Sequence, residues 1–198
     1  MVIPIESHPK FRPDKPRIIG LCGHMGVGKD AAAAMLSMIG YTRIAFADQV
    51  RDEVADCIQQ GMVPKKAMDR AYLPDDIRRA SVEEVWAKPT SERMRRILQW
   101  WGTEYRRDED PDYWTRSALK LAEAIPYCVF SDVRFPNEVQ AIRDRGGVVW
   151  KIQRETFIDG IPGHASELAV DDITPDLTIE NTGHLIDLAG KLRALLAA

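Results

Sequence analysis

The sequence predicts an α/β fold of three layers, in which a five-stranded parallel sheet lies between helices. Three observations predict it. Short apolar segments of strand length alternate with segments of helical periodicity, which is the pattern of strand–helix–strand units. A glycine-rich loop joins the first apolar segment to a helical one, as at the ligand-binding edge of such sheets. With 198 residues, the chain is long enough for one domain with a sizeable core.

Five apolar segments are the predicted strands. Near-continuous apolar runs of this kind are typical of parallel strands that helices cover on both faces. In chain order, the segments are Ile18–Cys22, Arg43–Phe46, Tyr127–Ser131, Val148–Ile152 and Leu177–Glu180.

Helical periodicity follows most of these strands. The first helix is expected from about Gly28 to Met38, and a second starts near Asp48. Another covers Asn137–Arg145 and ends at two glycines. Leucines at helical spacing after the last strand predict a C-terminal amphipathic helix, namely Leu185, Leu188, Leu192 and Leu195.

The long segment between the second and third strands, about residues 61–125, is predicted to be a helical insertion. Ser81 and Glu84 have the spacing of a capping box. Asp110 and Pro111 supply an N-cap and then a proline at the first helical position. An apolar stripe in this segment should face a core, and it consists of Met94, Ile97, Leu98 and Trp101.

We interpret residues 18–198 as one domain that follows a proline-rich arm of residues 1–17. An irregular segment after the fourth strand, about residues 154–167, is expected to be a short lid. The lid and the insertion should flank the glycine-rich loop at the carboxyl edge of the sheet, where ligands bind in open α/β folds.

Composition excludes several classes of protein. A net charge of −3 is not that of a protein that binds nucleic acid polymers. The sequence has neither an apolar run long enough to span a membrane nor the apolar core of a signal peptide, so we expect a cytoplasmic protein. Its three widely spaced cysteines are expected to be reduced and packed as apolar residues.

The glycine-rich loop, Gly23 to Asp30, reads GHMGVGKD and matches the phosphate-binding pattern G-x-x-x-x-G-K-[ST] except at its last position. Its glycines let backbone N–H groups close around an anion, and Lys29 has the length to reach the β- and γ-phosphates. The N-terminus of the following helix favours negative charge. These features predict a P-loop NTPase fold that binds a nucleoside triphosphate, and the family resemblance described below implies that this nucleotide is ATP. The expected ATP-binding residues are Gly23, Met25, Gly26, Val27, Gly28, Lys29, Asp30, Ala31 and Arg154.

Asp30 stands where the pattern has a hydroxyl that binds Mg²⁺. Mg²⁺ with ATP is the expected cofactor, held by carboxylates and by the phosphates themselves. Asp30 and Asp132, which ends the third strand, are the candidate ligands. Each has a structural alternative: Asp30 is favoured by the helix dipole, and Asp132 suits an N-cap or an ion pair with Arg134.

Six blocks of the sequence, taken in order, resemble the phage-type deoxynucleoside monophosphate kinases. The blocks are Gly23–Asp30 with its G-K-D ending, Phe46–Asp48, Leu98–Glu104, Ser131–Glu138, His164–Glu167 and Asp176–Gly183. The resemblance implies transfer of the γ-phosphoryl group of ATP to a deoxynucleoside 5′-monophosphate for DNA precursor synthesis, in the host cytoplasm if the source is a phage. It also implies that an aspartate at position 30 is normal for the family.

Arginines are the expected ligands of the acceptor phosphate, because the planar guanidinium binds phosphate through two N–H groups. Each candidate arginine has the alternative of a solvated surface charge. Trp100 is expected to project from the face shared with Arg93 and Arg96 and to stack on the base. The candidate acceptor-binding residues are Asp48, Arg51, Arg93, Arg96, Trp100, Gly102, Thr103, Glu104, Arg106, Arg134 and Glu138.

A monophosphate acceptor is already largely dianionic at neutral pH, so its phosphorylation needs positioning and charge neutralisation rather than a strong general base. The candidate catalytic residues are Lys29, Asp48, Asp132 and Arg134.

Two alternatives remain open. A small-molecule P-loop kinase resembling dephospho-coenzyme A kinase suits the block Phe46–Asp48 followed by Arg51. A nucleotide-dependent switch or motor is less compatible, since the N-K-x-D guanine motif is absent and Val133 rather than glutamate follows Asp132. The sequence leaves the accepted bases open, and both a monomer and a homodimer are compatible with it.

Overall fold

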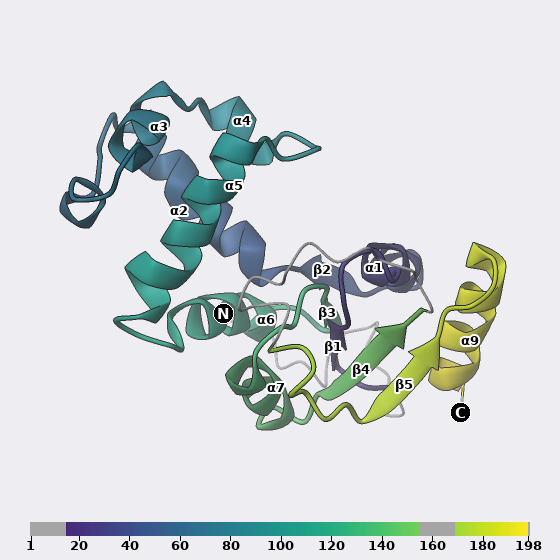
Figure 1. Cartoon of the computed structure of the whole chain (residues 1–198). Coiled ribbons are helices and arrows are strands. Elements are labelled where there is room, and N and C mark those ends of the chain that lie inside the picture. Colours follow the sequence, from purple (N-terminus) through teal and green to yellow (C-terminus); the bar gives the residue numbers. More distant parts are fainter. Residues whose placement is uncertain (1–14, 155–168, 198) are drawn as a thin grey trace. The chain divides into compact units, whose positions relative to one another are not determined.

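The computed structural model describes residues 15–154 and 169–197. The chain forms two compact units (Figure 1). One, here called the sheet unit, comprises Met1–Ala45 and Ala118–Ala198, and the other, the helical unit, comprises Phe46–Ser117. None of the helices in the described part of the chain is both long and apolar enough to cross a membrane.

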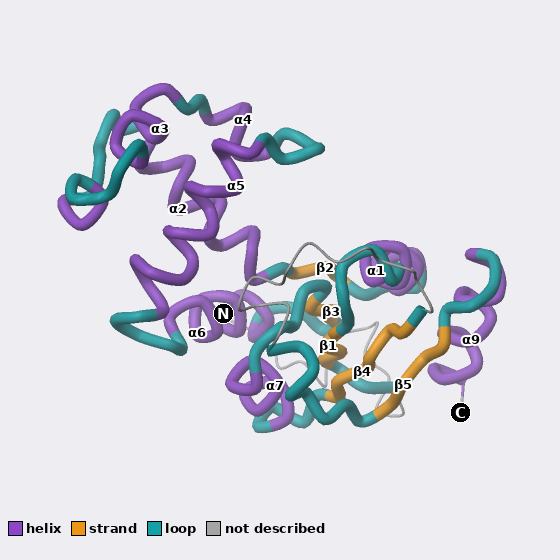
Figure 2. Tube along the Cα trace, viewed as in Figure 1, coloured by secondary structure: helices purple, strands orange, loops and turns teal. Residues whose placement is uncertain are grey.

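The sheet unit is built on five parallel strands in the order β2-β3-β1-β4-β5 (Figure 2). This arrangement confirms the predicted α/β fold with a five-stranded parallel sheet. The strands are β1 (Ile18–Cys22), β2 (Thr42–Ile44), β3 (Cys128–Phe130), β4 (Val148–Gln153) and β5 (Leu177–Glu180).

Three helices of the sheet unit pack on the two faces of this sheet: α1 (Lys29–Met38), α7 (Pro136–Arg143) and α9 (Leu185–Ala197). α1 and α9 share one face, where Leu36 and Leu192 pack with Val129 of β3 in a common buried cluster. α7 covers the other face, since Ile142 closely approaches Gly20 of β1. The loop between β1 and α1 is thereby fixed at both ends by buried elements.

The predicted end of the second strand was wrong by two residues, whereas the bounds of the other strands agree to within one residue. The sequence predicts a strand over Arg43–Phe46 and a helix near Asp48, but β2 ends at Ile44 and α2 begins at Phe46. Phe46 is buried, and an apolar residue at the start of a helix has the same appearance in sequence as one at the end of a strand.

The helical unit contains α2 (Phe46–Gln59), the 3₁₀ helix η2 (Lys65–Ala67), α3 (Leu73–Arg79), α4 (Val82–Trp86), α5 (Glu92–Trp100) and the π-helix η3 (Trp101–Arg107). α6 (Tyr113–Glu123) begins in this unit and ends in the sheet unit. The predicted capping box is present, because the Ser81 hydroxyl accepts from Glu84 N and the Glu84 carboxylate accepts from Ser81 N. The predicted helix start at Asp110 and Pro111 was wrong by a few residues, since Asp110 instead accepts from Asp112 N and pairs with Arg116.

The predicted orientation of Trp100 was also wrong. Its side chain is only 5% exposed and belongs to the core of the helical unit together with Trp101. Trp100 lies in α5 itself, next to the buried Ile97 and Trp101, and the π-helix that begins directly after it brings Tyr105 onto its ring. Trp100 stacks on Tyr105 with ring centroids 5.1 Å apart and an angle of 6° between the rings.

Candidate active site

The loop between β1 and α1 has the backbone of a phosphate-binding loop. Gly23 and Gly28 have φ angles of 135° and 105°, in the region that favours glycine. A Cβ at Gly23 would lie 2.3 Å from the backbone oxygen of Ile152, and one at Gly28 would lie 2.5 Å from Nδ2 of Asn181. Both glycines are therefore required by conformation and by space, and Gly28 leads directly into the first turn of α1.

Lys29 is held by the loop itself. Its Nζ donates to the backbone oxygens of Gly23, at 2.6 Å, and His24, at 2.7 Å. Its side chain is partly buried. The ammonium group consequently lies across the loop, in the position from which it can contact a phosphate bound there.

Asn181 supports the loop from the end of β5, and sequence reasoning did not assign it a role. It is 4% exposed, and its Nδ2 donates to the backbone oxygen of Val27 at 2.8 Å. Its own N–H donates to Gln153 O, which fixes it beside β4. The sequence did contain an indication of this role, because Asn181 is a polar residue directly after a predicted strand. It lies in the block Asp176–Gly183, which was used only as part of the family resemblance.

A second contact ties the loop to the segment before β5. Nε2 of His24 lies 2.9 Å from Oδ1 of Asp171, and both side chains are substantially exposed. The predicted lid, residues 154–167, lies outside the described residues except for Arg154, which is exposed just after β4.

The turn after β3 is organised by a buried carboxylate. Glu138 is 1% exposed, and its Oε2 accepts from the backbone N–H groups of Arg134, at 2.7 Å, and Phe135, at 3.2 Å. Asp132 and the side chain of Arg134 are both partly buried in this turn. The described contacts of Glu138 fix the backbone that presents Asp132 and Arg134, and its predicted contact with an acceptor stays a prediction.

The donor set of the sheet unit fits a magnesium ion that arrives with a nucleotide. The described residues contain no group of three or more His, Cys, Asp or Glu side chains that could hold a metal without other ligands. Mg²⁺ is typically bound by one or two protein oxygens together with phosphates and water. Asp30, exposed in the first turn of α1, and Asp132 remain the predicted carboxylate ligands. Ser131, directly before Asp132, has a buried hydroxyl without a hydrogen-bond partner among the described residues.

In the helical unit, Arg51 is a buried cation on α2. Its side chain is 7% exposed, and Nη2 donates to the hydroxyl of Thr90 at 3.1 Å. Nη1 is buried and has no hydrogen-bond partner in the described part of the chain. Burial lowers the pKa of the Arg51 guanidinium, and the nearby carboxylate of Asp48 partly opposes this shift. A guanidinium stays protonated in proteins, so Arg51 presents an unused N–H group and a poorly solvated charge to an anion.

The other predicted arginines of the helical unit are paired with carboxylates. Arg93 pairs with Glu84, and Arg96 pairs with Asp76 at 2.9 Å. Arg106 pairs with Glu53. Arg51 differs from these three predicted acceptor-binding arginines. Among the described residues, its hydrogen-bond partner is the hydroxyl of Thr90, and no carboxylate is hydrogen-bonded to it.

Glu53 is the centre of a polar network inside the helical unit. Its Oε1 accepts from Arg106 and from Nε1 of Trp101, and its Oε2 accepts from the hydroxyl of Tyr113 at 3.0 Å. The Arg106 guanidinium lies over the rings of Tyr105, at 4.5 Å, and Tyr113, at 4.7 Å. This network orients Arg106 and holds the π-helix on α2.

Three predicted acceptor residues lie in the π-helix. The backbone oxygen of Gly102 accepts from Nε1 of Trp114 at 2.8 Å, and that of Thr103 accepts from Asp108 N. The Glu104 carboxylate pairs with Arg70 at 2.9 Å. These contacts do not test the predicted contact of the three residues with an acceptor.

Two cysteines lie in strands of the sheet unit. Burial raises the pKa of the Cys22 and Cys128 thiols to about 11. Cys57 in α2 is also buried. All three are free thiols, as expected, and the raised pKa values keep the two strand thiols protonated at neutral pH.

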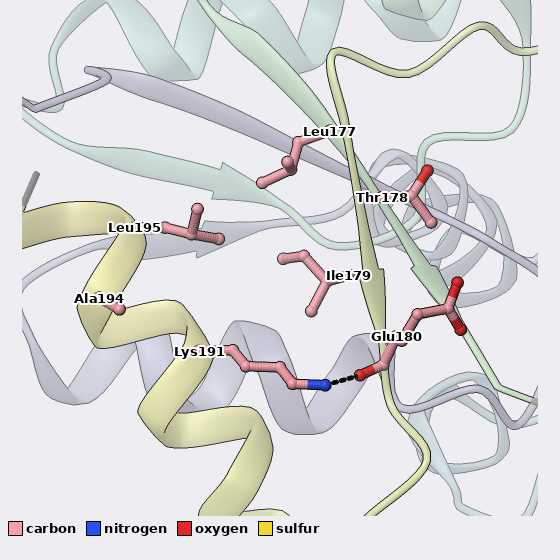
Figure 3. Close-up of a pocket in the computed structure, with 7 residues that line it drawn as sticks. All are labelled: Leu177, Thr178, Ile179, Glu180, Lys191, Ala194 and Leu195. Carbon is pink, nitrogen blue, oxygen red and sulfur yellow. Dashed lines mark hydrogen bonds between the residues drawn. The ribbon is translucent and has the colours of Figure 1, made fainter.

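A groove of about 490 Å³ lies between β5 and α9 (Figure 3). It is lined mainly by apolar side chains, among them Leu177, Ile179 and Leu195, and Lys191 donates to the backbone oxygen of Glu180 at one end. None of its lining residues belongs to the phosphate-binding loop. Its size alone does not make it the candidate site, since the loop is where backbone N–H groups and Lys29 converge.

The strand–loop–helix geometry and the order of the strands give the chain a P-loop α/β fold. No protein-family model matches the chain. Its sequence is similar to a protein of Acanthamoeba polyphaga mimivirus named "putative deoxynucleotide monophosphate kinase", with 28% identity over 170 residues, which is 76% of this chain and 77% of the viral protein.

Among solved structures, dephospho-CoA kinase from Campylobacter jejuni is similar with a TM-score of 0.49 and 13% identity, over 91% of this chain and 96% of that one. Shikimate kinase from Aquifex aeolicus has a TM-score of 0.46 and 11% identity, over the same shares of the two chains. At these scores the similarities carry no information on what this chain binds.

Proposed function

We propose that the chain is a kinase that transfers the γ-phosphoryl group of ATP to a deoxynucleoside 5′-monophosphate. The observation that carries the proposal is the loop from Gly23 to Lys29, in which glycine geometry and a lysine held across the loop meet at the N-terminus of α1. The name of the similar mimivirus protein supports the choice of acceptor.

The sheet unit is proposed to bind ATP. Its triphosphate would accept from loop N–H groups and from Lys29, which would exchange its two carbonyl partners for phosphate oxygens. The buried support from Asn181 keeps the loop in its anion-binding shape before a nucleotide arrives. A site formed in advance loses less conformational entropy on binding.

The helical unit is proposed to bind the acceptor phosphate through Arg51. Its buried Nη1 has no partner among the described residues, and a phosphate oxygen is a strong acceptor for a guanidinium. Thr90, which accepts from Nη2, holds the guanidinium plane in place. Neutralisation of a poorly solvated cation by a dianion makes this site favour phosphate over neutral ligands.

The chemistry proposed for these residues is positioning and charge neutralisation. Lys29, Arg134, Asp48 and Asp132 are the proposed catalytic residues, with Lys29 and Arg134 balancing charge on the transferring group. Mg²⁺, when bound with ATP, neutralises charge on the β- and γ-phosphate oxygens. The acceptor phosphate is already largely dianionic at neutral pH, so no side chain has to remove a proton from it.

An ATP-consumption assay against a panel of acceptors tests the proposal. The panel contains the deoxy- and ribonucleoside monophosphates, shikimate and dephospho-coenzyme A. Turnover that requires a deoxynucleoside monophosphate is the expected result. Turnover with dephospho-coenzyme A alone would select the other kinase class, and turnover without any acceptor would overturn the kinase assignment.

Replacement of the loop lysine gives the sharpest single test. Lys29→Ala should lower turnover by about a thousandfold, because it removes a charge that contacts the transferring phosphate. Its melting temperature should stay close to that of the wild type, since two hydrogen bonds to loop carbonyls are lost without a buried cavity. Lys65→Ala, at an exposed lysine of the helical unit, is the matched control and should leave turnover unchanged.

A further inference from the structure

Ser131 carries a buried hydroxyl that no contact in the described residues explains. The residue is 1% exposed, and its Oγ has no hydrogen-bond partner among them. Burial of a hydroxyl without a partner is unfavourable, so such groups usually have a ligand, a water molecule or a function.

The strand register places this hydroxyl on the face of the sheet that α1 covers. Side chains alternate along a strand, and Val129, two residues earlier, packs with Leu36 of α1. Ser131 continues the ladder beyond β3, since its N–H donates to Ile44 O at 3.0 Å. The Ser131 side chain therefore points to the α1 side at the carboxyl end of β3, which lies directly beside β1.

The phosphate-binding loop lacks the hydroxyl that its pattern provides. Position 30 holds aspartate instead of serine or threonine, and that hydroxyl is normally the protein ligand of Mg²⁺. We propose that Oγ of Ser131 supplies the missing hydroxyl ligand to the Mg²⁺ that binds with the nucleotide. The inference rests on the proposed function, because it assumes that the sheet unit binds Mg²⁺ with ATP or ADP.

The turn around Ser131 suits such a role. Val133 N donates to Leu21 O at 3.1 Å, so the segment after Ser131 is fixed to the central strand β1. Glu138 caps the next two backbone N–H groups. The backbone that carries the hydroxyl is therefore fixed, and one protein hydroxyl with phosphates and water satisfies Mg²⁺.

Calorimetric titration of ADP into the full chain, with and without Mg²⁺, tests the inference without depending on turnover. Ser131→Ala should bind ADP like the wild type in the absence of Mg²⁺, and its gain in affinity from Mg²⁺ should be about tenfold smaller. Its melting temperature should not fall, because the change removes an unpartnered buried hydroxyl. Thr115→Val is the matched control, since Thr115 is 2% exposed, has an unpartnered hydroxyl among the described residues and lies in the helical unit.

Ser131→Cys adds a spectroscopic readout. A thiolate prefers soft metals, so this variant should regain metal-dependent ADP binding with Cd²⁺ and show ultraviolet absorption from a sulfur–cadmium bond that the wild type lacks. A full Mg²⁺ effect in Ser131→Ala, or no cadmium absorption in Ser131→Cys, would overturn the assignment of Ser131 alone. A wild-type chain that binds no ADP under any condition would instead overturn the proposed function, and the assignment of Ser131 with it.

Discussion

The two units of the chain prepare for anions in different ways. In the sheet unit, the candidate phosphate site consists mainly of backbone groups, shaped by Gly23 and Gly28 and supported by Asn181. In the helical unit, the candidate ligands are long cationic side chains, and Arg93, Arg96 and Arg106 each pair with a carboxylate of the same unit. Local sequence encodes the loop of the first kind of site, whereas the second kind depends entirely on which charges the fold brings together.

The difference teaches how to interpret arginines in a kinase-like sequence. The charge of an arginine that already has a carboxylate partner is largely neutralised, so such an arginine gains less from a phosphate than a buried guanidinium with an unused N–H group. By this criterion Arg51 differs from Arg93, Arg96 and Arg106, although the sequence made all four equally good candidates for binding the acceptor phosphate.

Among the arginines of the helical unit, the largest effect is expected at Arg51. Arg51→Met should lower kcat/KM for the acceptor by about 30- to 100-fold, mainly through KM, because a charge-assisted hydrogen bond to phosphate contributes about 2–3 kcal/mol. Its melting temperature should not fall, since methionine fills the buried space without a desolvated charge. Steady-state kinetics with varied acceptor and saturating ATP measures the effect.

Arg96→Met is the control for that comparison, because Arg96 is half exposed and paired with Asp76. It should change kcat/KM by no more than about twofold. If Arg96→Met were as damaging as Arg51→Met, the distinction between paired and unpaired arginines would be wrong.

A smaller effect, on stability, is expected at Glu53. Glu53→Gln should lower the free energy of unfolding by about 2 kcal/mol, because Arg106 loses its carboxylate and the network of Trp101 and Tyr113 is left incomplete. Urea denaturation measures this loss. Glu109→Gln removes an exposed pair with Lys66 and should cost less than about 0.5 kcal/mol. Equal stability of the two variants would indicate that the ion pair between Arg106 and Glu53 does not stabilise the helical unit.

The smallest effect concerns the acidic face of α2. Burial, followed by the charges of Asp48 and Asp56, raises the pKa of the Asp52 carboxyl. A raised pKa means that the folded state disfavours the ionised carboxylate, so Asp52 lowers stability at neutral pH. Asp52→Asn should therefore raise the free energy of unfolding by about 0.3 kcal/mol at pH 7, the size of a helical like-charge pair in solvent.

The stabilisation by Asp52→Asn is expected to depend on pH in a defined direction. The gain from Asp52→Asn should shrink as pH falls through the raised pKa toward about 3.9, the ordinary value, because the wild-type carboxyl becomes protonated as well. Urea denaturation of both proteins between pH 7 and pH 4 measures the trend. A gain that grew toward low pH would contradict the assignment.

The bounds of a strand were predictable from the sequence where an apolar run has the same length as the strand. Ile18–Cys22 and Leu177–Glu180 have the predicted bounds, because each apolar run ends at a change in polarity. Phe46 was assigned to the wrong element, since burial alone does not distinguish a strand end from a helix start. Trp100 was predicted to be accessible because α-helical spacing does not show that Tyr105, five residues on in the π-helix, stacks on its ring.

The loop of the candidate site was predictable, but its supports were not. Glycine and lysine spacing encodes the loop locally, whereas Asn181 contacts it from a point 154 residues away in sequence from Val27. Similarly, Thr90 and Ser131 have ordinary sequence surroundings, and only tertiary structure shows that one accepts from Arg51 and the other has an unused hydroxyl. Partners distant in sequence leave no local pattern.

The two hydrogen bonds from Lys29 to the loop carbonyls also set a threshold for any ion in solution. A chloride ion or a single carboxylate must displace two good acceptors and offers few in return, so it competes poorly. In the proposed nucleotide complex, a triphosphate would replace both acceptors and engage the loop N–H groups at the same time. The self-contact of the lysine would then favour polyvalent anions over monovalent ones in a salt-rich solution.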